Sequence, residues 1–272
     1  MHYTYIALLQ NMYMRRISHI YATGRRVLPI VPVDQVDYTV DDLVRRELLL
    51  RKHAGICAPT RKKKDILGYI SNLRLDKNDC ICPYDIEPHT DYLALCGDNG
   101  DPFKDHYREL LIYASMNFQH TVFIAGDREY DRVTDPTVVV DRLNEISHDL
   151  PNVEFLNRDT TNIAGYTVIG ATLWNNGACN NNDGRMAKRK YITNGMNCRD
   201  VDWLTHIINA TTAEKIVLTH NAPTFLSHQL NDTNIYAWIC GSSRGIADSM
   251  YCMANTYDAN RKVTPVLAQL DI

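Results

Sequence analysis

The sequence lacks several features that would place it in a specialised class of protein. None of its apolar runs approaches the roughly 18–20 residues that a membrane-spanning helix needs. The opening MHYTYIALLQNMYMRR is too broken by polar residues for a secretory signal, and its charge lies on the wrong side. Apolar residues make up 45% and charged residues 22% of the 272, which excludes a disordered or collagen-like chain. We therefore expect one large domain, or one domain with an added arm.

The eight cysteines form no zinc-type CxxC pair. Cys80 and Cys82 are separated by one residue and have no second pair to complete a metal site. Cys96 and Cys240 lie inside apolar runs that are typical of buried strands. We expect reduced thiols and hence an intracellular, cytoplasmic protein.

A net charge of -3 conceals an uneven distribution of charge along the chain. Residues 1–64 carry 12 Lys and Arg against 5 Asp and Glu, a net +7, so the remainder carries -10. Apolar spacing over 6–20 and from about residue 39 predicts two helical segments in this basic arm. The arm could dock on the acidic surface of its own chain or on another protein subunit, and we expect protein subunits as partners. Four basic residues at 61–64 are too few to indicate nucleic-acid binding.

After residue 64 the pattern changes to short apolar runs that end in polar or glycine-rich loops. Such runs are typical of buried strands, and they lie at 66–73, 92–97, 121–126, 166–173, 215–219, 235–240 and 263–270. Helical patterns occur at 102–118, with Pro102 in the expected first turn, and at 138–150. Alternating strands and helices predict an α/β fold, in which functional side chains lie on loops at the carboxyl ends of the strands. Those loops are 72–75, 97–101, 126–130, 220–223 and 241–245.

In order along the chain, these loops resemble the signature blocks of the calcineurin-like metallophosphoesterases. The family's blocks are D-x-H, G-D, G-N-H-[DE], a strand ending in H, and G-H-x-H. The corresponding segments here are ILGYISNLRL, YLALCGDNGDP, VFIAGDREY, IVLTHNAP and WICGSSRG, and YTVIGATLW is similar to a further strand of the family. The resemblance covers about residues 65–272 and leaves the arm, residues 1–64, outside it. It implies a four-layer α/β/β/α sandwich with an N-terminal extension.

The resemblance also implies two divalent cations, roughly 3.5–4 Å apart, that bind a phosphate and activate a water molecule. Two metal-ligand positions keep their family identity: the bridging aspartate, Asp98, and the fourth-block histidine, His220. The other positions depart from the family pattern. The first-block Asp and His are replaced by Asn72 and Arg74. The third-block Asn and the phosphate-assisting His beside it are replaced by Asp127 and Arg128. The two last-block His are replaced by Ser242 and Arg244.

These departures predict that the metal pair is lost. Arg74 and Arg244 cannot bind a cation, because a guanidinium stays protonated and has no lone pair to give. Asp127 can still supply a carboxylate and Asn72 a weak carbonyl ligand. We expect a catalytically inactive phosphoesterase fold, without a cofactor, that serves as a structural or interaction component of a larger assembly. Reuse of inactive enzyme folds in particles of large DNA viruses suggests a virion by analogy. The alternative is a phosphoesterase with an altered or one-metal site that uses divalent metal ions.

Three of the replaced positions are arginines: Arg74, Arg128 and Arg244. Their guanidinium groups could neutralise the carboxylates that metal ions neutralise in the family, which keeps the site folded. They could instead form an anion site that grips phosphate or sulfate. The sequence leaves both interpretations open, and it assigns no role beyond an exposed loop to the asparagine-rich stretch 175–184.

Overall fold

The computed structural model describes residues 65–76, 86–174, 184–223, 234–242, 252–255 and 267–272. All of them belong to one compact unit, Thr60–Ile272. The arm expected over 1–64, Arg244 and residues 175–183 of the asparagine-rich stretch lie outside the described residues.

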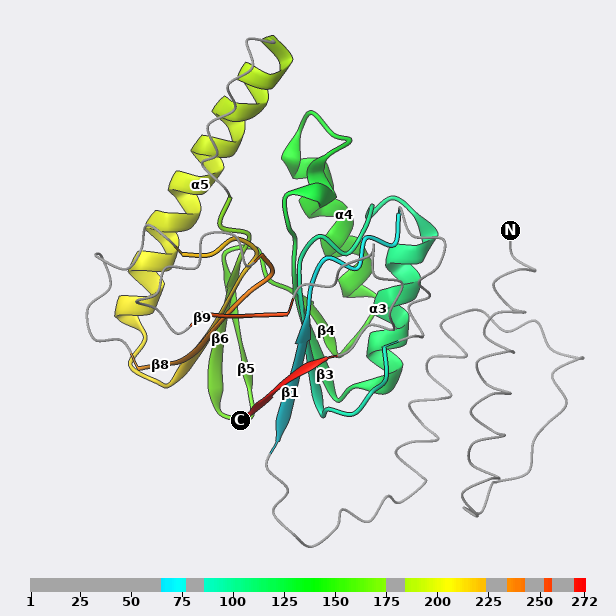
Figure 1. The fold of residues 1–272 in the computed structure, drawn as a ribbon, viewed down its shortest axis with the longest axis vertical. Coiled ribbons are helices and arrows are strands. Elements are labelled where there is room, and N and C mark those ends of the chain that lie inside the picture. The colour runs from blue at the N-terminus through cyan, green and yellow to red at the C-terminus, as the bar shows by residue number, and fades with distance from the viewer. Residues whose placement is uncertain (1–64, 77–85, 175–183, 224–233, 243–251, 256–266) are drawn as a thin grey trace, which may run out of the picture. The chain divides into compact units, whose positions relative to one another are not determined.

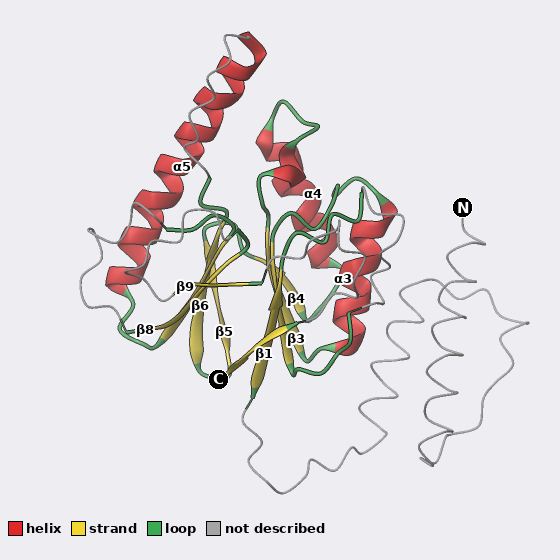
Figure 2. Cartoon of the chain, in the orientation of Figure 1, coloured by secondary structure: helices red, strands yellow, loops and turns green. Residues whose placement is uncertain are grey.

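In the described residues, ten strands form two five-stranded sheets that are mostly parallel (Figures 1 and 2). The first sheet has the order β10-β1-β2-β3-β4, and only β10 runs antiparallel to its neighbour. Its strands are β10 (Ala268–Asp271), β1 (Ile66–Ile70), β2 (Tyr92–Cys96), β3 (His120–Ile124) and β4 (Val153–Phe155). The second sheet has the order β5-β6-β7-β8-β9, with β5 antiparallel. Its strands are β5 (Asp159–Ile163), β6 (Tyr166–Ala171), β7 (Lys215–Thr219), β8 (Ile235–Cys240) and β9 (Cys252–Ala254).

The two sheets pack face to face because their central strands are apolar on both sides, as parallel strands covered on both faces must be. One core cluster joins the inner faces of both sheets, with Ala94 and Val122 of the first and Val168, Ile216 and Ile239 of the second. All five side chains are fully buried. This shared core places the carboxyl ends of β2 and β3 close to those of β7 and β8.

Helices cover the outer faces of the sheets (Figure 2). Helix α5 (Gly184–Ala210) packs Leu204 and Ile208 against Trp238 and Val217 of the second sheet. Helices α3 (Asp105–Asn117) and α4 (Pro136–His148) lie against β3 and β4 of the first sheet. The order helix, sheet, sheet, helix confirms the expected α/β class.

Helix α4 begins at Pro136 and ends at His148, so both ends lie ahead of the predicted range 138–150. Asp135 accepts a hydrogen bond from the Thr137 backbone N–H at 3.0 Å, and Pro136 occupies the first turn. Helix α3 differs from the expectation: it begins at Asp105, so Pro102 lies ahead of the helix and not in its first turn.

Three strands and one helix were missed by sequence reasoning. Strands β4 and β9 are three residues long, and β5 (DTTNI) is largely exposed and polar, so none gives an apolar run. Helix α5 begins in the basic stretch 184–190, which carries little apolar periodicity. Its packing on β6 and β8 through its later turns supplies the stability that its local sequence does not.

The expectation of reduced thiols needs a correction. Cys96 and Cys198 are free, whereas Cys240 is disulfide-bonded. An apolar run predicts that a cysteine is buried, but it cannot show that a second cysteine approaches it in the fold. Within the described part of the chain, no helix has the length and apolar character needed to cross a bilayer.

Candidate functional site

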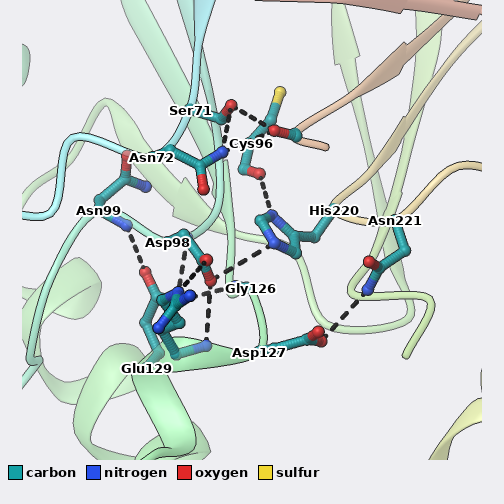
Figure 3. A network of polar contacts seen from close by, with 12 residues as sticks. Ser71, Asn72, Cys96, Asp98, Asn99, Gly126, Asp127, Glu129, His220 and Asn221 are labelled. Atoms are coloured by element: carbon teal, nitrogen blue, oxygen red, sulfur yellow. Dashed lines mark hydrogen bonds and ion pairs between the residues drawn. The ribbon is translucent and has the colours of Figure 1, made fainter. Parts of the chain in front are cut away.

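Loops from both sheets meet at the carboxyl ends of β1, β2, β3, β7 and β8 (Figure 3). The Asn72 backbone N–H donates to Gly97 O at 3.0 Å, which joins the β1 and β2 loops. The Asn72 side chain donates from Nδ2 to Gly241 O at 2.7 Å, which joins them to the end of β8. Sequence-predicted site residues from five separate segments are therefore brought to one place.

Asp98 lies at the centre of the site and is held by two cationic side chains. Its carboxylate Oδ2 lies 3.1 Å from Nε of Arg128, and Oδ1 accepts the Arg128 backbone N–H at 3.0 Å. Oδ1 also lies 3.4 Å from Nε2 of His220. Burial alone would raise the pKa of Asp98, but the hydrogen bond and charge of His220, together with Arg128, lower it below its ordinary value. Asp98 is therefore ionised and already neutralised by the protein itself.

His220 donates from both nitrogens of its ring. Nδ1 lies 2.8 Å from Cys96 O, a carbonyl that can only accept, and Nε2 faces the Asp98 carboxylate. Burial alone would lower the pKa of His220, but the hydrogen bond to Asp98 and the charges of Asp98 and Asp127 raise it to about 9. At neutral pH this ring is an imidazolium, which has no lone pair for a metal ion.

Two glycines allow the His220 ring to lie against the backbone. A Cβ on Gly126 would stand 2.8 Å from Nδ1 of His220 and 2.6 Å from the Asp98 backbone nitrogen. A Cβ on Gly241 would stand 2.5 Å from Nδ1 and would overlap Cys96 O. The glycines of the G-D-R-E and G-S-S-R segments are thus required by close packing around His220.

Glu129 is a site residue that sequence reasoning missed. Its side chain is buried, and Oε2 accepts the backbone N–H groups of Asp98 and Gly126, both at 3.0 Å. Oε1 accepts the Asn99 N–H at 2.8 Å. Burial and the nearby Asp98 charge raise the pKa of Glu129 to about 7, against the opposing effects of His220 and the backbone donors. The available signal was its place in the third block, where it matches the final [DE] of G-N-H-[DE].

Glu129 therefore fastens the loop after β2 to the loop after β3. It fixes Asp98 in a left-handed backbone conformation, with φ of 57°, which non-glycine residues seldom adopt. The carboxylate of Asp98 is thereby directed at Arg128 and His220.

The remaining candidates surround this centre with polar contacts. Asp127 is half-buried and accepts a hydrogen bond from Nδ2 of Asn221 at 3.2 Å (Figure 3). The Asn72 amide donates to Ser71 Oγ at 2.9 Å in addition to Gly241 O. Ser242 directs its backbone N–H to His220 O at 2.7 Å.

Arg74 differs from Arg128 in having no counter-ion. Its backbone N–H donates to Asp98 O at 3.2 Å, so the residue lies beside the centre. Its Nε is buried without a hydrogen-bond partner, and the structure shows no ion pair for its guanidinium in the described part of the chain.

The donors present do not fit a pair of divalent cations. Both oxygens of Asp98 are engaged by Arg128 and His220, and both ring nitrogens of His220 carry protons. Across the described ranges, no three His, Cys, Asp or Glu side chains are grouped so that they could hold a metal ion. Chemically, this arrangement balances charge, because Arg128 and His220 both lie against the Asp98 carboxylate.

Comparison with known proteins gives one sequence relative and a structural likeness. No family model matches the chain. The uncharacterized protein L509 of Acanthamoeba polyphaga mimivirus is 27% identical over 203 residues, which cover 61% of this chain and 71% of that protein. A solved structure superimposes with a TM-score of 0.40 at 12% identity, covering 71% of this chain and 89% of that one. The relative shows that a similar chain occurs in a mimivirus.

Proposed function

We propose that this chain is a degenerate calcineurin-like metallophosphoesterase that has lost hydrolysis and serves as a structural or interaction component of a larger assembly. In this proposal residues 1–64 form the arm that binds other protein subunits. The mimivirus relative makes a virus particle a compatible setting for such an assembly.

One observation carries the inactive-site part of the proposal. The position of the bridging metal ligand, Asp98, is bound by Arg128 at 3.1 Å and by the imidazolium of His220 at 3.4 Å. A metal ion would have to displace both cations and leave the His220 imidazolium buried without its counter-ion, and an uncompensated buried charge typically costs several kcal/mol. Without a held metal ion there is no activated water at neutral pH.

The site also supports a structural role, because its contacts join segments that are far apart in the sequence. Asn72, Asp98, Glu129, His220 and Gly241 connect five loops of two sheets through buried hydrogen bonds. Such a network stabilises the fold whether or not any reaction takes place.

The test is metal content and turnover of the full-length protein. We expect no stoichiometric manganese, iron, zinc or nickel after purification, and no hydrolysis of phosphomonoesters or phosphodiesters when these ions are added. Asp98→Asn serves as the matched variant, because it removes the charge of the carboxylate and retains most of its shape.

Metal-dependent hydrolysis by the protein itself would contradict the proposal. Metal-dependent turnover that disappears in Asp98→Asn and in His220→Gln would establish the alternative, a phosphoesterase with an altered or one-metal site. Turnover that persists in both variants would point to a contaminating phosphatase, and the inactive assignment would stand.

A further inference from the structure

Cys240 is a disulfide-bonded cysteine at the carboxyl end of β8, directly before the site residues Gly241 and Ser242. Its side chain is 1% exposed and lies in the core cluster between the second sheet and helix α5, together with Trp238 and Val217. The disulfide therefore holds the end of β8 from the side of the sheet that α5 covers.

The two residues after Cys240 are bound to other segments of the site. Gly241 O accepts a hydrogen bond from Nδ2 of Asn72 at 2.7 Å, and the Ser242 backbone N–H donates to His220 O at 2.7 Å. A Cβ on Gly241 would stand 2.5 Å from Nδ1 of His220, so the backbone and the ring are closely packed. Because of these contacts, a movement of the β8 end would disturb the loops after β1 and β7.

Cys96 ends β2 beside this segment, but it faces a different core. It is a free thiol, 1% exposed, in the cluster between the two sheets, whereas Cys240 lies in the cluster under α5. The backbones are close, since a Cβ on Gly241 would overlap Cys96 O. Buried thiols of this kind are unreactive, so Cys96 does not compete for the Cys240 sulfur.

We propose that the disulfide at Cys240 is a structural lock on the β8 end of the site, installed by an oxidation step during maturation of the chain. In this step two cysteine thiols form one S–S bond and pass two electrons and two protons to the disulfide of an oxidising protein, which becomes two thiols. Thiols stay reduced in ordinary cytosol, so the site is completed only where the chain meets such an oxidant. The inference goes beyond the proposed function and does not depend on it, because it concerns how the loops are held.

The experiment compares oxidised and reduced forms of the full-length protein by hydrogen exchange and thermal unfolding. The peptide that carries Gly241 and Ser242 should exchange faster in Cys240→Ser and in the unchanged protein refolded with dithiothreitol, whereas the β3 peptide, His120–Ile124, keeps its rate. The Tm of both reduced forms should fall by about 5–15 °C, as loss of a disulfide predicts. Cys198→Ser is the matched control, because Cys198 is a free and exposed thiol.

A second arm adds millimolar reduced glutathione to the folded, oxidised protein. Non-reducing peptide mapping should find the bond intact, since burial shields it, and the same mapping identifies the second cysteine. Loss of the bond while the protein stays folded would show a reversible disulfide and overturn the lock. The proposal also fails if mapping finds Cys240 as a free thiol after purification without reductant, or if Cys240→Ser and the refolded, reduced protein match Cys198→Ser in Tm and in exchange at Gly241 and Ser242.

Discussion

Arg128 holds Asp98 twice, with its side-chain Nε 3.1 Å from Oδ2 and its backbone N–H 3.0 Å from Oδ1. One residue of the β3 loop therefore orients and neutralises the carboxylate of the β2 loop. With His220 on the opposite side, the carboxylate is enclosed by positive charge.

Exchange of Asp98 for alanine should lower stability and not a catalytic rate. The change leaves the imidazolium of His220 buried without its counter-ion, so we expect a loss of about 3–5 kcal/mol in the free energy of unfolding. Urea unfolding measures this loss in the free energy of unfolding. Asp149→Ala, which removes the surface partner of Arg108, should cost no more than about 1 kcal/mol. Equal losses in the two variants would contradict the central role of Asp98.

Glu129→Gln should be destabilising despite its near-identical shape. An amide has one oxygen, so its Nε2 would face backbone N–H groups that now donate to a carboxylate oxygen. Each unmatched buried donor costs about 1–3 kcal/mol, measured by urea or thermal unfolding. Glu154→Gln, at a half-exposed ion pair with His120, is the control and should have little effect. A Glu129 variant as stable as this control would show that the loops hold without the carboxylate.

Stability should fall as pH rises through the alkaline range because of His220. Its pKa is raised from 6.5 to about 9 in the folded protein, so the folded state binds a proton more tightly than the unfolded chain. The contribution is fully present below pH 6.5 and is lost as the pH approaches and passes 9. Unfolding followed from pH 6 to 10 should show this loss in the unchanged protein and in the exposed-site control His148→Gln. A curve of the same slope in His220→Gln would rule His220 out as its source.

Removal of residues 1–64 should leave a folded body that no longer associates with its partners. In the described part of the chain, two core clusters bury side chains of both sheets and of α5, and Asp65 O accepts the Ile272 N–H at 2.8 Å. Circular dichroism and sedimentation of the two forms measure folding and association. A truncated chain that unfolds, or that keeps its partner, would assign the arm to the interior of its own chain.

Sequence reasoning could place the central strands because their signal is local. Apolar runs bounded by glycine and polar residues mark β2, β3, β6, β7 and β8 to within a few residues. The strand-end rule then selected the loops at 97–101, 126–130 and 220–223. The family resemblance selected Asp98, Asp127, Arg128 and His220 within them, and the structure brings these residues together. It could not find the short strands or α5, whose stability comes from packing on other elements.

Residue identity alone determined that Arg74, Arg128 and Arg244 cannot be metal ligands, because an arginine cannot donate a lone pair wherever it lies. Only the tertiary structure decided which arginine neutralises which carboxylate. Arg128 reaches Asp98, whereas Arg74, on the neighbouring loop, pairs with no carboxylate among the described residues. The role of Glu129 also became visible only in three dimensions, since its partners are backbone N–H groups that every sequence possesses. The sign of a side chain's charge is a property of the residue itself. Which charged side chains form pairs depends on the distances between them, and the packing of the two sheets sets those distances.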